Sequence, residues 1–521
     1  MRFFALFLIL LSSTGVSAED FYIDPNSGSD SGLGTAESPW KSLTGVLNGG
    51  KISSERYSTP YTSPEPLIKK NIKGVIKPGD RILLASGNYG DVLIDAYVNS
   101  DFITIEALPG HDVLFGKLKV RASNKWIIKG VKVSPEYGGS YKTWDSIVTI
   151  EDHGYKGPSG NITLEGNQIF SAASSGNWSK EQWTLNSRGG VLVNSNNITL
   201  KDNLLKNIKH AIVVKRNNNK IIGNKIIDFS GDGMRSTGDD NLFQGNYVVS
   251  PHKVDANHDD HFQSWSIGPD GKVGKGTVYR NILRNNVFIT VVNENQKFKS
   301  TAHGVGAFDG MYEDWVVENN IVVVNHWHGI SFLGLKNSKI INNTIVDIWP
   351  DAKGPAEIKV LPHKNGTPST GNIVANNLVY KAKNAGGVLE NNLPVDLNDF
   401  VSWQTKDFRL KKYSKGINSA NSKFSATYDI EWKKRDSKPD VGAYEYEEDA
   451  SNAEASTSEE IVDVAEQNEL VTGPVVEEEV IEAQVVEEEK NSVTELGGAS
   501  GQDSSMETLI KQRSSDTTLS R

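Results

Sequence analysis

The feature that most constrains the fold is a short segment that recurs along the chain and ends in asparagine. Each copy has a few residues, mostly branched and apolar, followed by a bend. Copies without long inserted loops end 21 to 23 residues apart, as Asn203, Asn224 and Asn246 do. This interval is typical of one coil of a parallel β-solenoid, and longer intervals indicate coils with inserted loops. The copies lie at residues 161–167, 197–203, 220–224, 241–246, 281–286, 315–320, 339–343 and 372–377.

The recurring asparagine is predicted to be structural. An Asn can adopt the left-handed conformation of a bend, and its amide can bond to the Asn of the coils above and below. Outside the repeat, short β-branched runs between turns continue, with one short helix expected after Trp40. No helical period of useful length interrupts them, which disfavours alternating strands and helices. The chain is therefore predicted to be all-β.

The two ends of the chain differ from the repeat region. Arg2, an apolar run over residues 3–11 and small residues before Glu19 form the three-part pattern of a secretory signal, predicted over 1–18. The apolar run is too short to span a bilayer. Residues 447–521 contain 20 Asp or Glu against 4 Lys or Arg and no aromatic residue, which predicts a disordered acidic tail. The solenoid domain is expected over 19–446.

Charge and cysteine content bear on the surroundings of the protein. The chain has no cysteine and so no disulfide. Its formal charge of −10 combines −16 in the tail with about +6 in residues 1–446. A mildly basic folded part favours a polyanionic substrate. We expect a secreted protein, extracellular or periplasmic, that is monomeric, binds no nucleic acid and has no membrane span after signal cleavage.

Residues 230–267 hold two acidic bends in consecutive coils. Aligning the strands that follow the bends places Ile212, Met234 and Phe262 on one face. Because side chains alternate along a strand, these three are predicted to point inward. The outward surface is predicted to be a polar, partly aromatic strip over the apolar core, made of Lys215, Arg235, His261, Gln263 and Trp265.

The chain resembles the secreted right-handed parallel β-helix proteins of the pectate-lyase-like superfamily. The matching parts are residues 21–40, the segment Pro78-Gly79-Asp80, the Asn repeat and the closing residues 439–446. The resemblance implies a right-handed parallel β-helix over about residues 20–446. It is specific for the fold and does not fix the reaction.

The acidic bends suggest a metal site. Asp232 and Asp260 occupy equivalent positions one coil apart, and stacked like charges are destabilising unless a cation or a proton lies between them. Asp259 and Gln263 add two more oxygen donors. Sites with oxygen ligands alone suit Ca²⁺. The alternative is that the three Asp residues cap turns.

The same bends resemble the calcium site of the family nine pectate lyases. There, an Asp-Gly-aromatic turn precedes an Asn-x-Asp-Asp-Gly-aromatic-Asp-x-Trp turn, and Trp265 matches the final aromatic residue. His261 departs from the pattern, because it stands in the place of Gly, and Gln263 stands in the place of an Asp. The resemblance implies that four residues bind calcium: Asp232, Asp259, Asp260 and Gln263.

A lyase that cleaves a uronate polymer must neutralise the carboxylate, remove the adjacent proton and protonate the leaving oxygen. The related lyases use a Lys base on a later coil, but the aligned segments 303–308 and 328–332 contain no Lys. Lys215 is then the candidate base and Arg235 the carboxylate clamp, and the alternative for Lys215 is an ordinary solvated lysine, which exposed strand ends favour. The remaining candidates are His261 for catalysis and, for substrate binding, Trp265, His303 and His328.

Three functions remain open from the sequence. The first is a secreted polysaccharide lyase that cleaves an acidic polysaccharide such as alginate or pectate by β-elimination. The second is a glycoside hydrolase with paired carboxylates, either Asp232 with Asp259 or Asp260, or Asp239 with Asp240. The third is a non-catalytic carbohydrate-binding surface solenoid that contacts sugars through Trp265, Trp315, Trp327 and Trp349.

Overall fold

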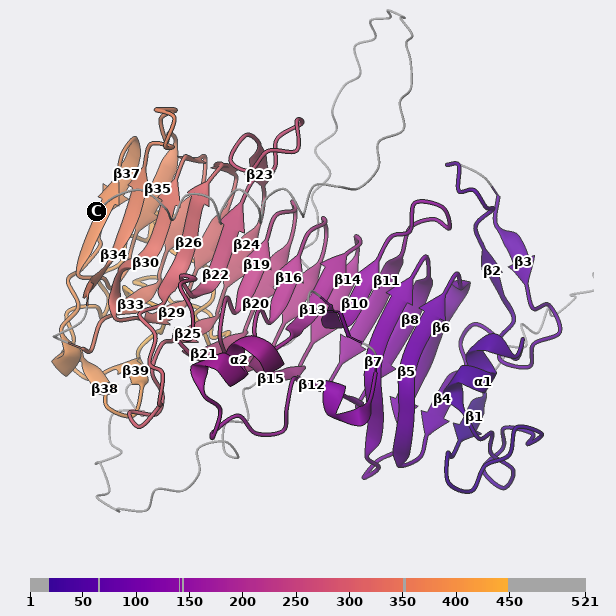
Figure 1. The fold of residues 1–521 in the computed structure, drawn as a ribbon. Coiled ribbons are helices and arrows are strands. Elements are labelled where there is room, and N and C mark those ends of the chain that lie inside the picture. The colour runs from indigo at the N-terminus through magenta and orange to yellow at the C-terminus, as the bar shows by residue number, and fades with distance from the viewer. Residues whose placement is uncertain (1–17, 64–65, 140, 143–144, 350–352, 448–521) are drawn as a thin grey trace, which may run out of the picture. The chain divides into compact units, whose positions relative to one another are not determined.

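The computed structural model describes residues 18–447 except 64–65, 140, 143–144 and 350–352 (Figure 1). Their strands stack in parallel into a right-handed β-helix, as predicted, with three rows of strands around one core. Apart from Ala18 and Glu447, the predicted signal peptide and acidic tail lie outside the described residues. No helix in the described part of the chain is long and apolar enough to cross a bilayer.

The first row opens with β1 and continues to β37, and a hairpin of β2 and β3 adjoins β6. The predicted short helix is α1 (Leu43–Asn48), which begins where the Ser42 side chain accepts a hydrogen bond from the Gly45 N–H. The strands are β1 (Asp20–Ile23), β2 (Ser54–Arg56), β3 (Ile68–Lys70), β4 (Arg81–Leu84), β6 (Val98–Ala107), β8 (Asn124–Lys129), β11 (Gly160–Glu165), β14 (Ile198–Lys201), β17 (Lys220–Ile222), β20 (Leu242–Gln244), β24 (Ile282–Arg284), β28 (Val316–Glu318), β32 (Lys339–Ile341), β35 (Asn372–Ala375) and β37 (Gly387–Glu390).

The second row contains the strands on which the sequence predicted the outward polar residues. Its strands pair in parallel, each with the strand of the next coil. They are β5 (Gly87–Asp95), β7 (Val113–Arg121), β10 (Ser146–Glu151), β13 (Gly189–Asn194), β16 (Ile212–Val214), β19 (Met234–Ser236), β22 (Asp260–Trp265), β26 (His303–Asp309), β30 (His326–Leu333), β34 (Lys353–Leu361) and β36 (Lys381–Asn384).

The third row and a few separate elements complete the described chain. The row contains β9 (Lys132–Val133), β12 (Gln168–Phe170), β15 (Leu204–Ile208), β18 (Lys225–Phe229), β21 (Tyr247–Pro251), β25 (Val287–Ile289), β29 (Ile321–Val323) and β33 (Thr344–Val346). The separate elements are α2 (Lys180–Asn186), the sheet of β23 (Thr277–Tyr279), β27 (Met311–Glu313) and β31 (Leu335–Lys336), the pair β38 (Phe400–Ser402) and β39 (Asp407–Leu410), and 3-10 turns at Pro135–Tyr137, Leu397–Asp399 and Ser422–Phe424.

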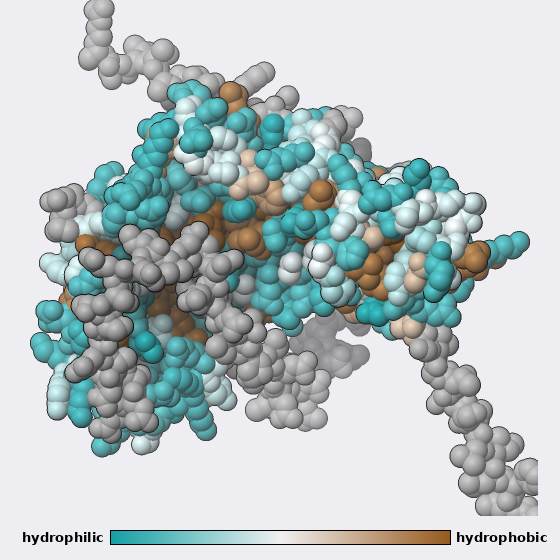
Figure 2. Space-filling view, turned by 90° about the horizontal axis from the view of Figure 1, so that it is seen from below, coloured by the Kyte–Doolittle hydropathy of each residue, from teal (hydrophilic) through white to brown (hydrophobic). Residues whose placement is uncertain are grey.

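The core confirms the predicted direction of the aligned strands. Ile212 pairs in register with Met234, and Met234 with Phe262, and all three side chains are fully buried. They belong to one apolar cluster that runs from Phe21 to Val379. On the face seen in Figure 2, hydrophilic residues predominate and apolar residues reach the surface in separate patches. The inward face of the coils therefore supplies the burial that holds them together.

The asparagine ladder is present, but the left-handed bend and the amide bonds, predicted for one Asn, belong to two neighbouring residues. The left-handed conformation belongs to the residue before the ladder Asn, as at Asp202, Gly223 and Asn285. Each ladder Asn except the last, Asn392, is buried and donates its amide N–H to the Asn of the next coil, with bonds of 2.7 to 3.0 Å. The ladder comprises Asn167, Asn203, Asn224, Asn246, Asn286, Asn320, Asn343, Asn377 and Asn392.

Candidate functional site

On the outward side of the second row, one residue from each of six successive strands lies in register with the next. These six residues are called the strip from here on. Parallel pairing fixes the line, because each member lies directly opposite the next across neighbouring strands. The middle members, Gly306 and Ser331, are small, whereas the flanking members are long and cationic or polar. In order, the strip consists of Arg235, Gln263, Gly306, Ser331, Lys359 and Lys383.

Asp232 and Arg235 form an ion pair at the start of the strip. The Arg235 Nε–H donates to Asp232 Oδ2, and the other carboxylate oxygen accepts the Asp260 backbone N–H at 3.1 Å. The Asp232 side chain is fully buried. Burial raises its pKa to about 6, with the Asp260 charge acting in the same direction and Arg235 opposing it. Arg235 is therefore the cation that offsets the stacked carboxylates.

Asp260 and His303 form a second pair, one coil further along. The His303 Nδ1 lies 2.7 Å from Asp260 Oδ1, and Gln263 donates its amide N–H to Asp260 Oδ2 at 3.0 Å. Asp260 is buried and only a tenth of the His303 side chain is exposed. An ionised carboxylate only accepts hydrogen bonds, so it holds the proton of a neutral imidazole on Nδ1 and leaves Nε2 as a base.

Gly306 makes room for this pair. A Cβ at Gly306 would lie 2.6 Å from Asp260 Oδ1 and 2.9 Å from the Phe308 ring. Such distances are below van der Waals contact, so any side chain here would displace the carboxylate from His303. Glycine is thus required on the strip for steric reasons at a position whose φ is ordinary.

We expect Gly306→Ala to lower turnover by about tenfold, in the range seen when groups that orient a catalytic residue are disturbed. The cause would be the displacement of the Asp260 carboxylate from His303. Steady-state kinetics and thermal melting of the variant check this. Gly304→Ala is unsuitable as a control, because its Cβ would lie 2.2 Å from the Gly329 carbonyl oxygen. Gly154→Ala, at an exposed glycine where a Cβ would meet no atom within 4 Å, is the matched control. Unchanged turnover in Gly306→Ala would contradict the steric role.

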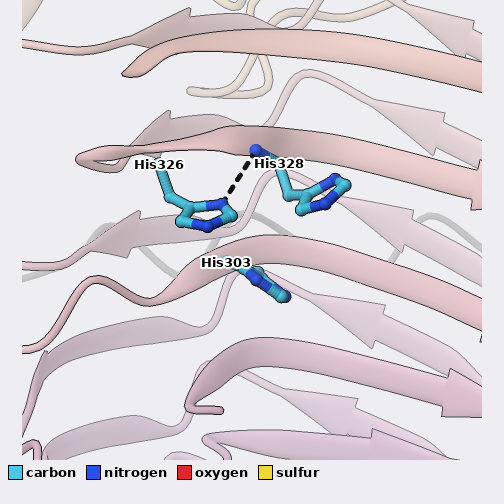
Figure 3. A group of neighbouring side chains, drawn as sticks. All are labelled: His303, His326 and His328. Carbon is cyan, nitrogen blue, oxygen red and sulfur yellow. Dashed lines mark hydrogen bonds between the residues drawn. The ribbon is translucent and has the colours of Figure 1, made fainter. Parts of the chain in front are cut away.

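Two further imidazoles, His326 and His328 of β30, lie beside His303 of β26 (Figure 3). The ring centroids of His326 and His328 lie 4.4 and 4.8 Å from that of His303. His328 Nδ1 lies 2.8 Å from the Ser331 hydroxyl. Burial lowers the pKa values of His326 and His328 to about 3, and the neighbouring His303 adds to the shift. Both rings are therefore neutral near pH 7.

The same three rings offer nitrogens within 4.8 Å of one another, a grouping that could hold a transition metal ion. However, His326 Nδ1 accepts the backbone N–H of His328 at 3.1 Å, shown as the dashed line in Figure 3. A neutral imidazole that accepts at one nitrogen carries its proton on the other, so His326 presents no free lone pair. The cluster as arranged suits proton transfer better than metal binding.

Most carboxylate oxygens of the predicted calcium donors accept hydrogen bonds within the protein. Both oxygens of Asp232 and both oxygens of Asp260 already accept hydrogen bonds from the protein. Asp259 Oδ1 is buried without a partner, while its Oδ2 accepts from the Ser300 hydroxyl at 2.5 Å. Burial raises the pKa of Asp259 to about 7, and the Ser300 hydrogen bond opposes the shift. The contacts of Asp232 resemble the capping alternative.

His261 does not lie on the outward surface, contrary to the prediction. Its side chain is fully buried, with its ring centroid 5.9 Å from that of Phe229 and 5.8 Å from that of Phe288. Its Nδ1 bonds to the His303 carbonyl at 2.8 Å. Strand alternation fails here because β22 begins at the bend, where the Asp260 carboxylate turns outward to His303. His261 therefore cannot reach a substrate.

Lys215 is not brought beside the paired residues of the strip. It lines a separate polar cavity of about 400 Å³, together with Arg216, Thr237 and Asp239. The register places Lys215 opposite Thr237, one residue beyond the paired stretch of β16 and β19. Asp239 accepts the Tyr279 backbone N–H, and Asp240 pairs with Arg280 at 2.6 Å. The two Asp residues therefore serve structural bonds.

The tryptophans suggested as sugar contacts occupy different environments. Trp265 is half-buried on the outer face, with its ring 5.4 Å from the Arg235 guanidinium carbon. Trp327 is 42% exposed, and Lys359 Nζ lies 5.8 Å from its ring centroid. Trp315 is fully buried in the core and cannot contact a sugar. Aromatic faces therefore accompany the cations at both ends of the strip.

Sequence reasoning missed the roles of Gly306, His326 and Lys359. Lys359 lies 3.4 Å from Glu357, which also pairs with Lys383. The sequence His326-Trp327-His328 could have signalled the histidine cluster, since two imidazoles two residues apart share one side of a strand. Its proximity to Asp260 depends on two successive strand pairings that the repeat spacing alone does not provide.

No family model matches the sequence, and no curated protein is detectably similar to it. Among solved structures, the chain is similar to pectate lyase Pel9A, with 15% identity, a TM-score of 0.44 and coverage of 83% of this chain and 97% of that one. It is similar to the PL6 family alginate lyase AlyGC, with 16% identity, a TM-score of 0.41 and coverage of 70% and 55%. It is also similar to a GH136 lacto-N-biosidase from Eubacterium ramulus, with 12% identity, a TM-score of 0.33 and coverage of 73% and 68%. These similarities concern the fold alone.

Proposed function

We propose that the protein is a polysaccharide lyase that cleaves an acidic, uronate-containing polysaccharide by β-elimination on the strip. The observation that carries the proposal is the Asp260–His303 pair, with its 2.7 Å bond, on the strands that carry Gln263 and Gly306 of the strip. Cationic side chains on both sides of these residues complement a negatively charged polymer. Export, predicted from residues 1–18, is part of the proposal because such polymers lie outside the cell.

His303 is the proposed base, in place of Lys215 and His261. Asp260 fixes its proton on Nδ1, so Nε2 can take the proton from the carbon next to the substrate carboxylate. The positive charge that forms on His303 is stabilised by the Asp260 carboxylate. The neutral rings of His326 and His328 add no opposing charge.

Arg235 and Lys359 are the proposed partners of substrate carboxylates. Neutralising the carboxylate makes the adjacent proton more acidic, because negative charge spreads onto the carboxyl group in the transition state. Trp265 and Trp327 lie close to these cations and offer faces on which sugar rings stack. No step of this proposal uses calcium.

The reaction balances without an external reactant. His303 takes a proton, the electron pair of the broken C–H bond forms a carbon–carbon double bond, and the bond to the leaving glycosidic oxygen breaks. The leaving oxygen takes a proton from the imidazolium or from water. One new end of the polymer therefore carries an unsaturated uronate.

We expect purified protein to release product absorbing near about 230 nm, the absorption of an unsaturated uronate formed by base-catalysed elimination. A panel of alginate, pectate and other anionic glycans, with neutral glycans as controls, tests this in EDTA. New reducing ends without this absorbance would favour a hydrolase. Binding without any new ends would favour a carbohydrate-binding solenoid.

A further inference from the structure

A second cavity lies at the first coils, away from the Asp260–His303 pair. Its volume is about 370 Å³, within the range of about 300 to 1,000 Å³ typical of small-ligand sites. It is formed where the β2–β3 hairpin and the end of α1 meet the end of β5. Its lining combines cations, two tyrosines and small apolar residues: Leu47, Arg56, Tyr57, Lys70, Ala96, Tyr97 and Lys156, with Asp95.

Positive charge exceeds negative charge in this cavity. Arg56, Lys70 and Lys156 line it, and Asp95 is the one carboxylate among its lining residues. Asp95 is already bonded to Arg121 through both oxygens, at 3.0 and 2.8 Å, and also accepts from Lys156. Three cations and one neutralised carboxylate make a site that favours an anion.

Lys70 is held in place at the wall of the cavity. Its Nζ donates to the carbonyls of Asp95 and Ala96, at 2.9 and 3.0 Å, and lies 3.1 Å from the Tyr97 ring centroid. Burial lowers its pKa to about 8, with Lys156 and Arg56 adding to the shift and Asp95 opposing it. An ammonium group so placed has little freedom to lose when an anion binds.

The cavity lies on the same outward surface as the strip. Asp95 pairs in register with Arg121, and Arg121 with Glu151, in the row that continues through β13, β16 and β19 to β22. Six strand steps of about 4.8 Å place it about 30 Å from Trp265 along the row. A polymer lying along this row can reach both sites.

We propose that the cavity formed by Arg56, Lys70 and Lys156 is an accessory subsite for one anionic sugar residue of the polymer. Arg56 and Lys156 bind its carboxylate, Lys70 adds positive charge at the wall of the cavity, and Tyr57 contacts the apolar face of its ring. This inference rests on the proposed function for the identity of the polymer. Because the subsite is remote from His303, it contributes to the binding of long chains and not to the chemical step.

Protection of Lys70 from acylation tests the subsite without turnover. We expect sodium glucuronate to slow acetylation of Lys70 several-fold, measured by mass spectrometry of peptides, while glucose has no effect. Lys69, which is exposed and paired with Glu55 at 2.7 Å, is the internal control. Arg56→Gln and Lys156→Gln should abolish the protection. Equal protection by glucose, equal protection by inorganic sulfate, or none with glucuronate would overturn the proposal.

Kinetics on the polymer give the second measurement. Arg56→Gln should raise KM for long chains about three- to tenfold with kcat unchanged, as expected when binding is lost equally from ground and transition states. Lys69→Gln should change neither constant, and a fall in kcat in Arg56→Gln would contradict the accessory role. The labelling experiment is repeated in His303→Ala. Protection of Lys70 should persist in that variant, because the cavity is remote from His303. Protection in wild-type protein that forms no unsaturated product from any glycan of the panel would retain the subsite and overturn the proposed lyase activity.

Discussion

Replacing His303 by alanine is expected to lower kcat by about 10² to 10⁴, the usual contribution of a general base. The variant lacks the imidazole that Asp260 orients, so no base is in place to take the proton next to the substrate carboxylate. KM should change little, since Arg235 and Lys359 remain. The measurement is the initial rate of unsaturated product formation with the best substrate of the panel, together with a melting curve that shows the variant is folded.

Two further variants make the His303 result specific. Asp260→Asn should reduce kcat and shift the pH–rate profile, because an amide cannot fix the proton of His303 on Nδ1. His111→Ala, at an exposed histidine outside the strip, is the matched control and should retain full activity. Full activity of both His303→Ala and Asp260→Asn would exclude the proposed base. If His111→Ala also lost activity, the losses would reflect disturbed folding and not the removal of a base.

Asp259→Asn is expected to stabilise the protein at alkaline pH. The folded-state pKa of about 7 exceeds the ordinary value of 3.8, so Asp259 binds its proton more tightly in the folded state. Its contribution to stability is therefore fully present below about pH 4 and is lost as the pH rises through about 7. At about 1.4 kcal/mol per pKa unit, the wild type loses on the order of 4 kcal/mol across this window. Asparagine carries no charge and avoids that loss.

Apparent melting temperatures at pH 4 and pH 9 measure the Asp259 effect, in EDTA and in calcium. The variant should melt at or slightly below the wild type at the lower pH and several degrees above it at the higher pH. Asp255→Asn, in the same loop and paired with Lys209 at 3.7 Å, serves as control. A variant that melts below the wild type at pH 9, in calcium only, would show that Asp259 is an ionised calcium ligand after all.

The fold could be predicted from the sequence because its repeat is local. Each coil is recognisable in the sequence by an apolar run and an Asn bend. The inward direction of Ile212, Met234 and Phe262 follows from the alternation of side chains along a strand. What the repeat could not reveal is the division of the bend between a left-handed residue such as Asp202 and the ladder Asn203 that follows. Asn can occupy both positions of such a bend, so composition alone does not show which of the two is left-handed.

The site was harder to predict because its contacts join different coils. Asp232 and Asp260 were expected to be close, and the structure places the Asp260 N–H on the Asp232 carboxylate. The cation that the structure places beside these carboxylates is Arg235, through its bond to Asp232. His261 was misplaced because alternation does not hold at the bend that starts β22. The base candidate His303 comes from a coil 43 residues after Asp260, a separation set by loop length.

The stacking of coils has a consequence for the length of chain that the protein recognises. The cavity at β5 and the histidine at β26 are separated by whole rungs, so their spacing changes only in steps of about 4.8 Å. Duplicating one coil, such as residues 204–224, would preserve the ladder and lengthen the row by one strand spacing. The shortest oligosaccharide that gains affinity from both ends should then grow by about one sugar unit.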